Sequence, residues 1–154
     1  MKLYLVQHGE ATTVEEDSER PLTAQGRADV EKVARFMAAA GVHADRVFHS
    51  GILRAQQTAE ILAKAVCPEN EPTEAPMSIA PKDQPGALAD EANHWGDDVM
   101  VVGHLPFMAR AASLLAAGSP GVKAVAFRPG TVVCLERPED SWAVAWMVRP
   151  ELLK

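Results

Sequence analysis

A buried-strand pattern that stops at a histidine occurs twice in this chain, and it constrains the fold more than any other feature. Residues 3–6 are apolar and are followed at once by Gln7-His8-Gly9-Glu10, and residues 99–102 are followed by Gly103-His104. Strands without polar alternation are typical of sheets that helices cover on both faces. Ligands of open α/β sheets bind beyond the carboxyl ends of the strands. The pattern therefore predicts a site in which one imidazole reacts and the other assists.

The rest of the chain alternates strands and helices over its first two-thirds, which predicts βαβ units and a largely parallel sheet covered by helices. We expect strands at residues 2–6, 46–49, 73–75, 98–102, 123–127, 131–136 and 142–148, the last two as a hairpin. We expect helices from Thr23 to about Gly41, from Ser50 to Pro68, over residues 87–94, and from Pro106 to about residue 117. Thr23 and Ser50 should cap the helices that follow them.

Length, charge and cysteine content narrow the class of protein. The chain has 154 residues, 47% of them hydrophobic, so we expect one domain over residues 1–154. Its net charge of −6 argues against nucleic acid as a partner. No apolar run approaches the roughly 18 residues of a membrane helix, and no long apolar stripe favours an oligomer, so we expect a monomer without a membrane partner. Cys67 and Cys134 lack a metal-like spacing and indicate free thiols in a reducing, cytoplasmic compartment.

Three side chains supply the groups that phosphoryl transfer requires. The imidazole of His8 can act as a nucleophile and hold a phosphoryl group covalently. Arg54 lies in the first turn of the expected second helix, where its planar guanidinium and the free N–H groups of the helix can bind oxyanions. His104 can donate a proton to another phosphoryl oxygen.

Other residues near these segments have less certain roles. Arg20 can add a positive donor, although the acidic side chains at residues 16–19 could pair with it instead. Glu10 either orients His8 or is simply exposed, and Ser50 is a helix cap first and a neighbour of the site second. Gly9 lets the backbone approach a ligand or a neighbouring helix closely.

The chain resembles the histidine phosphatase (phosphoglycerate-mutase-like) superfamily, and within it the small phosphohistidine phosphatases of the SixA group. The resemblance covers nearly the whole chain and rests on His-Gly-Glu-Ala at residues 8–11, Arg-Pro-Leu-Thr at 20–23 with Gly26, residues 50–58, and Val-Gly-His at 102–104. It implies a three-layer α/β/α sandwich, phosphorylation of His8, phosphate binding by Arg54 and His104, and neither metal nor cofactor.

One position departs from the family pattern, which begins Arg-His-Gly. Here the arginine position is Gln7, a neutral amide. Loss of a charge-assisted hydrogen bond to phosphate costs about 1.5–3 kcal/mol, roughly ten- to a hundredfold in affinity or rate. We expect Gln7 to donate a neutral hydrogen bond to phosphate, while Arg54 and Arg20 carry the charge.

The lack of a recognisable proton donor agrees with a phosphoramidate substrate. Many relatives with alcohol leaving groups use a Glu or Asp as general acid, whereas Asp83, Asp90 and Glu91 here belong to no recognisable motif. A leaving imidazole is less basic than an alkoxide and needs less protonation. Short connections leave little chain for a lid, so an open pocket suits a phosphohistidine presented by another protein.

We therefore expect a metal-independent phosphohistidine phosphatase of signal transduction, acting on a partner such as a histidine phosphotransfer domain. Two alternatives stay open: a general small phosphomonoesterase, and a phosphate- or phosphoprotein-binding module weakened by Gln7. A mutase is the least supported, because the chain lacks the length for further substrate-holding segments.

Overall fold

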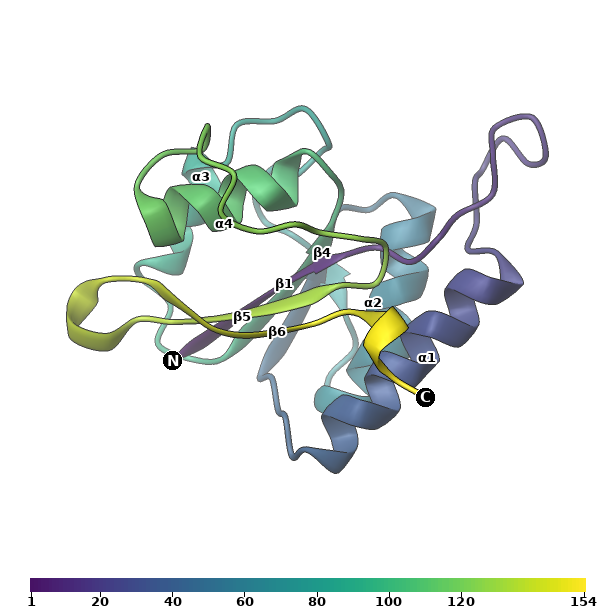
Figure 1. Cartoon of the computed structure of the whole chain (residues 1–154), viewed down its shortest axis with the longest axis horizontal. Coiled ribbons are helices and arrows are strands. Elements are labelled where there is room, and N and C mark those ends of the chain that lie inside the picture. The colour runs from purple at the N-terminus through teal and green to yellow at the C-terminus, as the bar shows by residue number, and fades with distance from the viewer.

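Helices cover both faces of a six-stranded sheet in the computed structural model, which describes residues 1–154 (Figure 1). The strands are β1 (Lys2–Gln7), β2 (Arg46–His49), β3 (Thr73–Glu74), β4 (Val99–Gly103), β5 (Val132–Glu136) and β6 (Ala143–Val148). The helices are α1 (Ala24–Ala39), α2 (Leu53–Val66), α3 (Gly86–Ala92) and α4 (Phe107–Ala117), with 3-10 turns at Pro138–Asp140 and Pro150–Leu152. None of the helices is both long and apolar enough to cross a membrane.

The sheet has the order β3-β2-β4-β1-β5-β6, and its first four strands are parallel. β5 runs antiparallel to both β1 and β6. The predicted α/β fold with a mostly parallel central sheet is therefore confirmed. In the register of β1 and β4, Gln7 lies opposite Gly103, so His8 and His104 each follow their strand at the same edge of the sheet.

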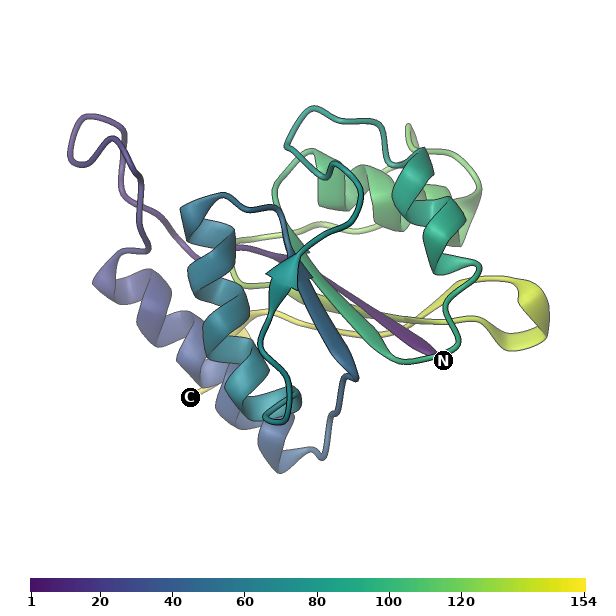
Figure 2. The ribbon, with the colours of Figure 1, turned by 180° about the vertical axis from the view of Figure 1, so that it is seen from behind.

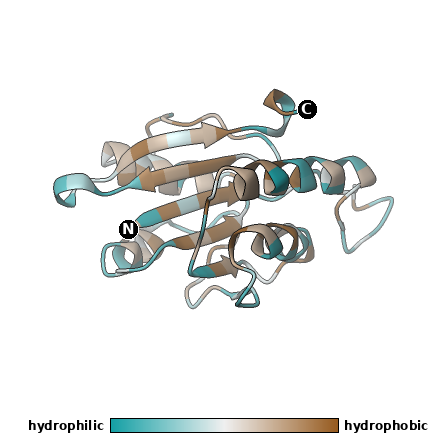
Figure 3. Cartoon of the chain, turned by 90° about the horizontal axis from the view of Figure 1, so that it is seen from below, coloured by the Kyte–Doolittle hydropathy of each residue, from teal (hydrophilic) through white to brown (hydrophobic).

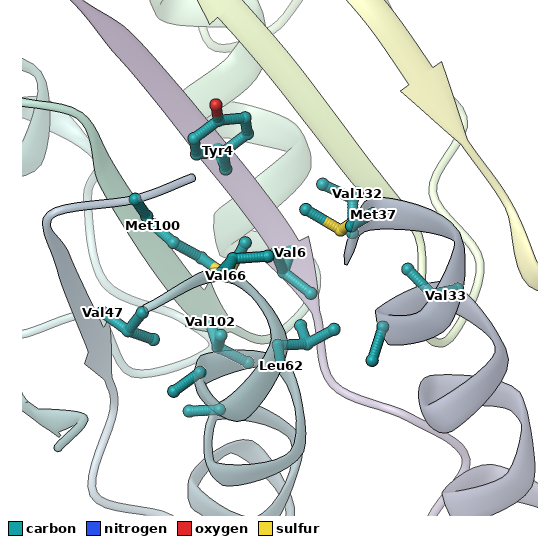
Figure 4. Close-up of a cluster of buried hydrophobic side chains, with 14 of the residues drawn as sticks. Tyr4, Val6, Val33, Met37, Val47, Leu62, Val66, Met100, Val102 and Val132 are labelled. Carbon is teal, nitrogen blue, oxygen red and sulfur yellow. The ribbon is translucent and has the colours of Figure 1, made fainter. Parts of the chain in front are cut away.

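Side chains of β1 alternate between two buried layers, which explains its lack of polar residues. Tyr4 and Val6 pack on the side of α1 and α2, where Figure 4 shows them with side chains of both helices. Leu3 and Leu5 pack on the side of α3 and α4. Figure 2 shows the same layers from behind. In Figure 3 the central strands are mostly brown, while the hydrophilic colour gathers on helices, turns and loops.

The expected strand at residues 123–127 is wrong, because this segment has no regular structure. β5, the strand that follows it, is already paired on both sides by β1 and β6. The segment lies along α4 instead: Ala124 N donates to Ser113 Oγ at 3.4 Å, and Val125 and Phe127 pack against the apolar layer beneath. The alternation that resembles a strand comes from this one-sided packing.

Candidate active site

Three distant segments bring His8, Arg54 and His104 together at the carboxyl edge of the sheet. The Nε of Arg54 lies 3.4 Å from Nε2 of His8, and the ring centroids of His8 and His104 are 5.1 Å apart. The convergence follows from topology, since β4 pairs with β1 on one side and with β2, which leads into α2, on the other. The three residues predicted to form the site are therefore neighbours.

The ring of His8 is held in a defined tautomer. Its Nδ1 lies 2.7 Å from the carbonyl oxygen of Gly9. A carbonyl only accepts hydrogen bonds, so Nδ1 carries the proton and Nε2 carries the free lone pair. Burial, together with the positive charges of Arg54 and Arg20, lowers the pKa of His8 to about 4, against the opposing effect of the Gly9 carbonyl. At neutral pH His8 is thus an uncharged imidazole with an available nucleophilic nitrogen.

Arg54 is the second residue of α2 and has no acidic partner. No carboxylate lies within ion-pair distance of its guanidinium. Ile52 occupies the N-cap position and supplies no side-chain cap, so N–H groups of the first turn remain available to an anion. Burial and the charge of Arg20 lower the pKa of Arg54. This is a cationic group whose natural partner would be an oxyanion.

His104 is 1% exposed and contacts Ser50 rather than solvent. Its Nε2 lies 2.6 Å from Ser50 Oγ, whereas its buried Nδ1 has no hydrogen-bond partner. Burial, followed by the influence of His8, lowers the pKa of His104 to about 3. Ser50 is not the helix cap that we expected, because Gly51 adopts a left-handed conformation (φ +86°) and α2 begins only at Leu53. The hydroxyl instead accepts from Ile52 N at 3.3 Å, just before the helix, and meets the imidazole of His104.

The other two residues expected to bind phosphate, Gln7 and Arg20, form no hydrogen bond to the side chains of His8, Arg54 or His104. Arg20 has a left-handed φ of +49°, and its Nε donates to the carbonyl of Thr12 at 2.9 Å. It forms no ion pair with the acidic residues before it, and its charge contributes to the lowered pKa of His8. Gln7 is 7% exposed, and its Oε1 is buried without a partner. An unpartnered buried acceptor is uncommon and costs free energy, so it marks a place where a ligand or water would bind.

Two side chains of α2 position the site, and sequence reasoning gave them no separate role. Thr58 Oγ1 accepts a hydrogen bond from Gly9 N at 3.0 Å and donates to the carbonyl of Arg54 at 2.8 Å. Gln57 Oε1 accepts from Leu22 N at 2.8 Å. The available signal was spacing, because Thr58 lies four residues after Arg54 and hence on the same face of the helix.

Glycines let the loop after β1 lie directly on α1. A Cβ on Gly26 would collide with the backbone carbonyl of Glu10, and one on Gly9 would lie 2.7 Å from Cγ2 of Val30. The exposed side chain of Glu10 accepts from Thr23 Oγ1 at 2.7 Å. It therefore does not orient His8, and that alternative is wrong: the carbonyl of Gly9 takes this role.

No carboxylate joins the cluster as a proton donor. Asp83 accepts hydrogen bonds from Ser78 and from Ala80 N, and neither it nor Asp90 nor Glu91 bonds to the site histidines. No group of three or more His, Cys, Asp or Glu side chains could hold a metal ion. What the arrangement offers is a neutral nucleophile, the guanidinium of Arg54 beside it, a second imidazole, and the nearby positive charge of Arg20.

Comparison with known proteins gives this geometry a context. Residues 3–76 match the family model of the histidine phosphatase superfamily (branch 1). An uncharacterized protein of Picosynechococcus sp. is 33% identical over 128 residues, which are 79% of this chain and 76% of the relative. The structure of the protein histidine phosphatase SixA complexed with tungstate superposes with a TM-score of 0.86 at 25% identity, over 100% of both chains. A phosphoserine phosphatase of Entamoeba histolytica, in complex with 3-phosphoglyceric acid, has a TM-score of 0.70 at 16% identity, over 95% of both chains.

Proposed function

The chain belongs to the histidine phosphatase superfamily, and we propose that it is a phosphohistidine phosphatase that works through a covalent phospho-His8 intermediate. The observation that carries the proposal is the pairing of His8 and Arg54. Nε2 of His8 carries the unprotonated lone pair, and it accepts a long hydrogen bond, 3.4 Å, from Nε of Arg54. A nucleophile beside an unpaired guanidinium is the arrangement that attack on a phosphoryl group needs.

In the first half of the reaction, Nε2 of His8 attacks phosphorus and the P–N bond of the substrate breaks. The leaving imidazole takes up a proton from solvent, and the phosphoryl group is now bonded to His8. Arg54 exchanges its contact with Nε2 for the phosphoryl oxygens. His104, held by Ser50 at 2.6 Å, donates to another oxygen, and Arg20 adds positive charge.

In the second half, water attacks the phosphoryl group and the P–N bond to His8 breaks. Inorganic phosphate leaves, and His8 returns to its neutral form. The carbonyl of Gly9 accepts from Nδ1 in both halves, so it holds the same ring orientation for attack and for release. Neither half requires a group that the chain does not provide, apart from water and a proton.

A phosphohistidine substrate fits the lack of a carboxylic acid among the side chains bonded to the cluster, because an imidazole leaves more readily than an alkoxide. We further propose that this phosphohistidine belongs to a signalling protein such as a histidine phosphotransfer domain. The setting we propose is the cytoplasm, where Cys67 and Cys134, both buried, would stay reduced. We propose that the enzyme acts as a monomer.

Two observations support other functions. The similarity of fold to a phosphoserine phosphatase supports a general phosphomonoesterase. The neutral Gln7, with its unpartnered Oε1, supports a module that binds phosphate without turning it over. The phosphohistidine phosphatase, the phosphomonoesterase and the binding module differ in which substrate, if any, the protein hydrolyses. Hydrolysis assays can therefore distinguish them.

The test compares kcat/KM for phosphohistidine, phosphoserine and nitrophenyl phosphate, using the wild type and His8→Asn. We expect the wild type to hydrolyse phosphohistidine best and His8→Asn to hydrolyse none of the three. Faster hydrolysis of the two monoesters would establish the phosphomonoesterase. Vanadate binding without any hydrolysis, in both the wild type and Gln7→Arg, would establish the binding module.

A further inference from the structure

Figure 1 shows the irregular segment that follows α4. The side chains of this segment and of α4 form a groove beside the candidate active site. Its volume is about 530 Å³. One wall is formed by residues of α4 and the turn before it, and the other by residues 120–127. The side chains that the groove offers to a partner are mainly Leu105, Pro106, Val122, Val125 and Phe127.

The groove begins one residue after His104. Leu105, which lines it, follows His104 directly in the chain and is 37% exposed, whereas His104 is 1% exposed. On the other wall, Val122 is 47% exposed. Exposed apolar side chains that gather in one concave surface are typical of an interaction site rather than of a solvated surface.

The charge of the groove is opposite to that of the protein. Its charged side chains are Arg110 and Lys123, and no carboxylate lines it, although the chain as a whole has a net charge of −6. Neither cation forms an ion pair; Arg110 donates only to the neutral Oε1 of Gln84, at 2.9 Å. Two unpaired cations at an apolar groove favour an acidic partner.

The loop on the opposite side of His8 carries negative rather than positive charge. Residues 11–21 extend away from the sheet on the side of α1, far from α4 in both Figure 1 and Figure 2. This loop carries four exposed carboxylates, at Glu15, Glu16, Asp17 and Glu19. An acidic partner would be repelled by this loop and attracted to the groove. The loop and the groove together therefore favour one orientation of the partner on the site.

We propose that this groove docks an acidic, amphipathic helix of the protein that presents the phosphohistidine. No residue that lines the groove belongs to a strand, so a partner cannot bind here by adding a strand to the sheet. A helix can lay its apolar face between two walls and direct its acidic flank to Arg110 and Lys123. The inference rests on the proposed function and adds to it the surface that selects a protein substrate over free phosphohistidine.

The test separates docking from chemistry by using two substrates. One is free phosphohistidine, and the other is a histidine phosphotransfer domain that carries phosphohistidine on an acidic helix. The groove variant is Arg110→Glu with Lys123→Glu. Its matched control, Arg35→Glu with Lys64→Glu, changes the net charge equally at exposed positions of α1 and α2 outside the groove.

We expect the groove variant to lower kcat/KM for the phosphorylated domain by about tenfold at low salt, through KM, and less at high salt. Its activity on free phosphohistidine and both activities of the control should stay within about twofold of the wild type. Val122→Ser, a neutral change at an exposed apolar side chain, should also raise KM for the domain only; because it leaves the charge of the groove unchanged, such a loss would report apolar contact.

Equal losses in the groove variant and the control, or no loss in the groove variant, would overturn the docking inference while free phosphohistidine is still hydrolysed. A wild type that shows no preference for the domain over free phosphohistidine would overturn it as well. Failure of the wild type to hydrolyse either substrate would instead overturn the proposed function, and the inference with it.

Discussion

Gln7 is the residue of the candidate site that departs from the family pattern, in which this position is an arginine. Its side chain is buried, and its Oε1 has no partner, so the position carries an acceptor where an anion would favour a donor. The sequence could identify the substitution, but not that the amide oxygen would be left unpaired. That fact depends on which groups the sheet and α2 bring to the same edge.

Replacing Gln7 with arginine should strengthen anion binding. The new guanidinium would add a charge-assisted hydrogen bond and remove the unpartnered oxygen, which is worth about 1.5–3 kcal/mol, or roughly ten- to a hundredfold. Titration with vanadate measures this change. Gln7→Glu, of similar size but negative, is the control and should weaken binding; an affinity unchanged in both variants would show that position 7 does not face the anion.

At the scale of elements, the site depends on how α2 holds the loop after β1. Thr58→Val keeps the shape of the side chain but removes the oxygen that accepts from Gly9 N, and the buried N–H would lose its partner. We expect a loss of about 1–3 kcal/mol in the free energy of unfolding, together with lower kcat, measured by urea titration and steady-state kinetics. Thr58→Ser keeps the hydroxyl and should retain most of both. Equal behaviour of the two variants would mean that the hydrogen bond has no positioning role.

The close approach of this loop to α1 can be tested with two glycines. Gly26→Ala would force a Cβ against the backbone carbonyl of Glu10, and backbone cannot move aside cheaply. We expect it to destabilise the fold by about 1–3 kcal/mol and to reduce activity, as thermal unfolding and kinetics would report. Gly86→Ala, at the first position of α3, meets no atom within 4 Å and should stabilise by up to about 1 kcal/mol. A harmless Gly26→Ala would contradict the packing described above.

The elements themselves were largely predictable, because their signals are local. Helix α1 has its expected cap, with Thr23 Oγ1 accepting from Gly26 N, and β2 has the expected bounds. The errors lie where tertiary contacts override local pattern. Residues 123–127 alternate like a strand but pack along α4, and Ser50 resembles a cap but contacts His104. Thr58 and the groove beside α4 could not be found, since both depend on contacts between elements distant in sequence.

At the scale of the whole molecule, two apolar layers share one sheet, so we propose that residues 1–154 form a single domain that unfolds cooperatively. Its stability should fall as the pH drops below about 6.5. The folded-state pKa values of His8 and His104 are lowered to about 4 and about 3, below the ordinary value of 6.5. In the window between these values the unfolded chain binds more protons than the folded chain, which favours unfolding.

Denaturant titrations at pH 7 and pH 5 measure this linkage. We expect one transition at each pH and a smaller free energy of unfolding at pH 5. His104→Asn removes one of the two imidazoles whose pKa values are lowered to about 4 and about 3, and should reduce the difference in the free energy of unfolding between the two pH values. A wild type that is equally or more stable at pH 5 would contradict the burial of neutral histidines at the site.

The most direct measurement of the central claim is the identity of the phosphorylated residue. The protein is incubated with phosphohistidine or phosphoramidate, quenched in alkali and mapped by mass spectrometry. We predict an acid-labile phosphate on His8 that is absent from His8→Asn and never found on His104. Hydrolysis of the substrate with phosphate on His104, or with no phosphorylated histidine at all during turnover, would contradict the account.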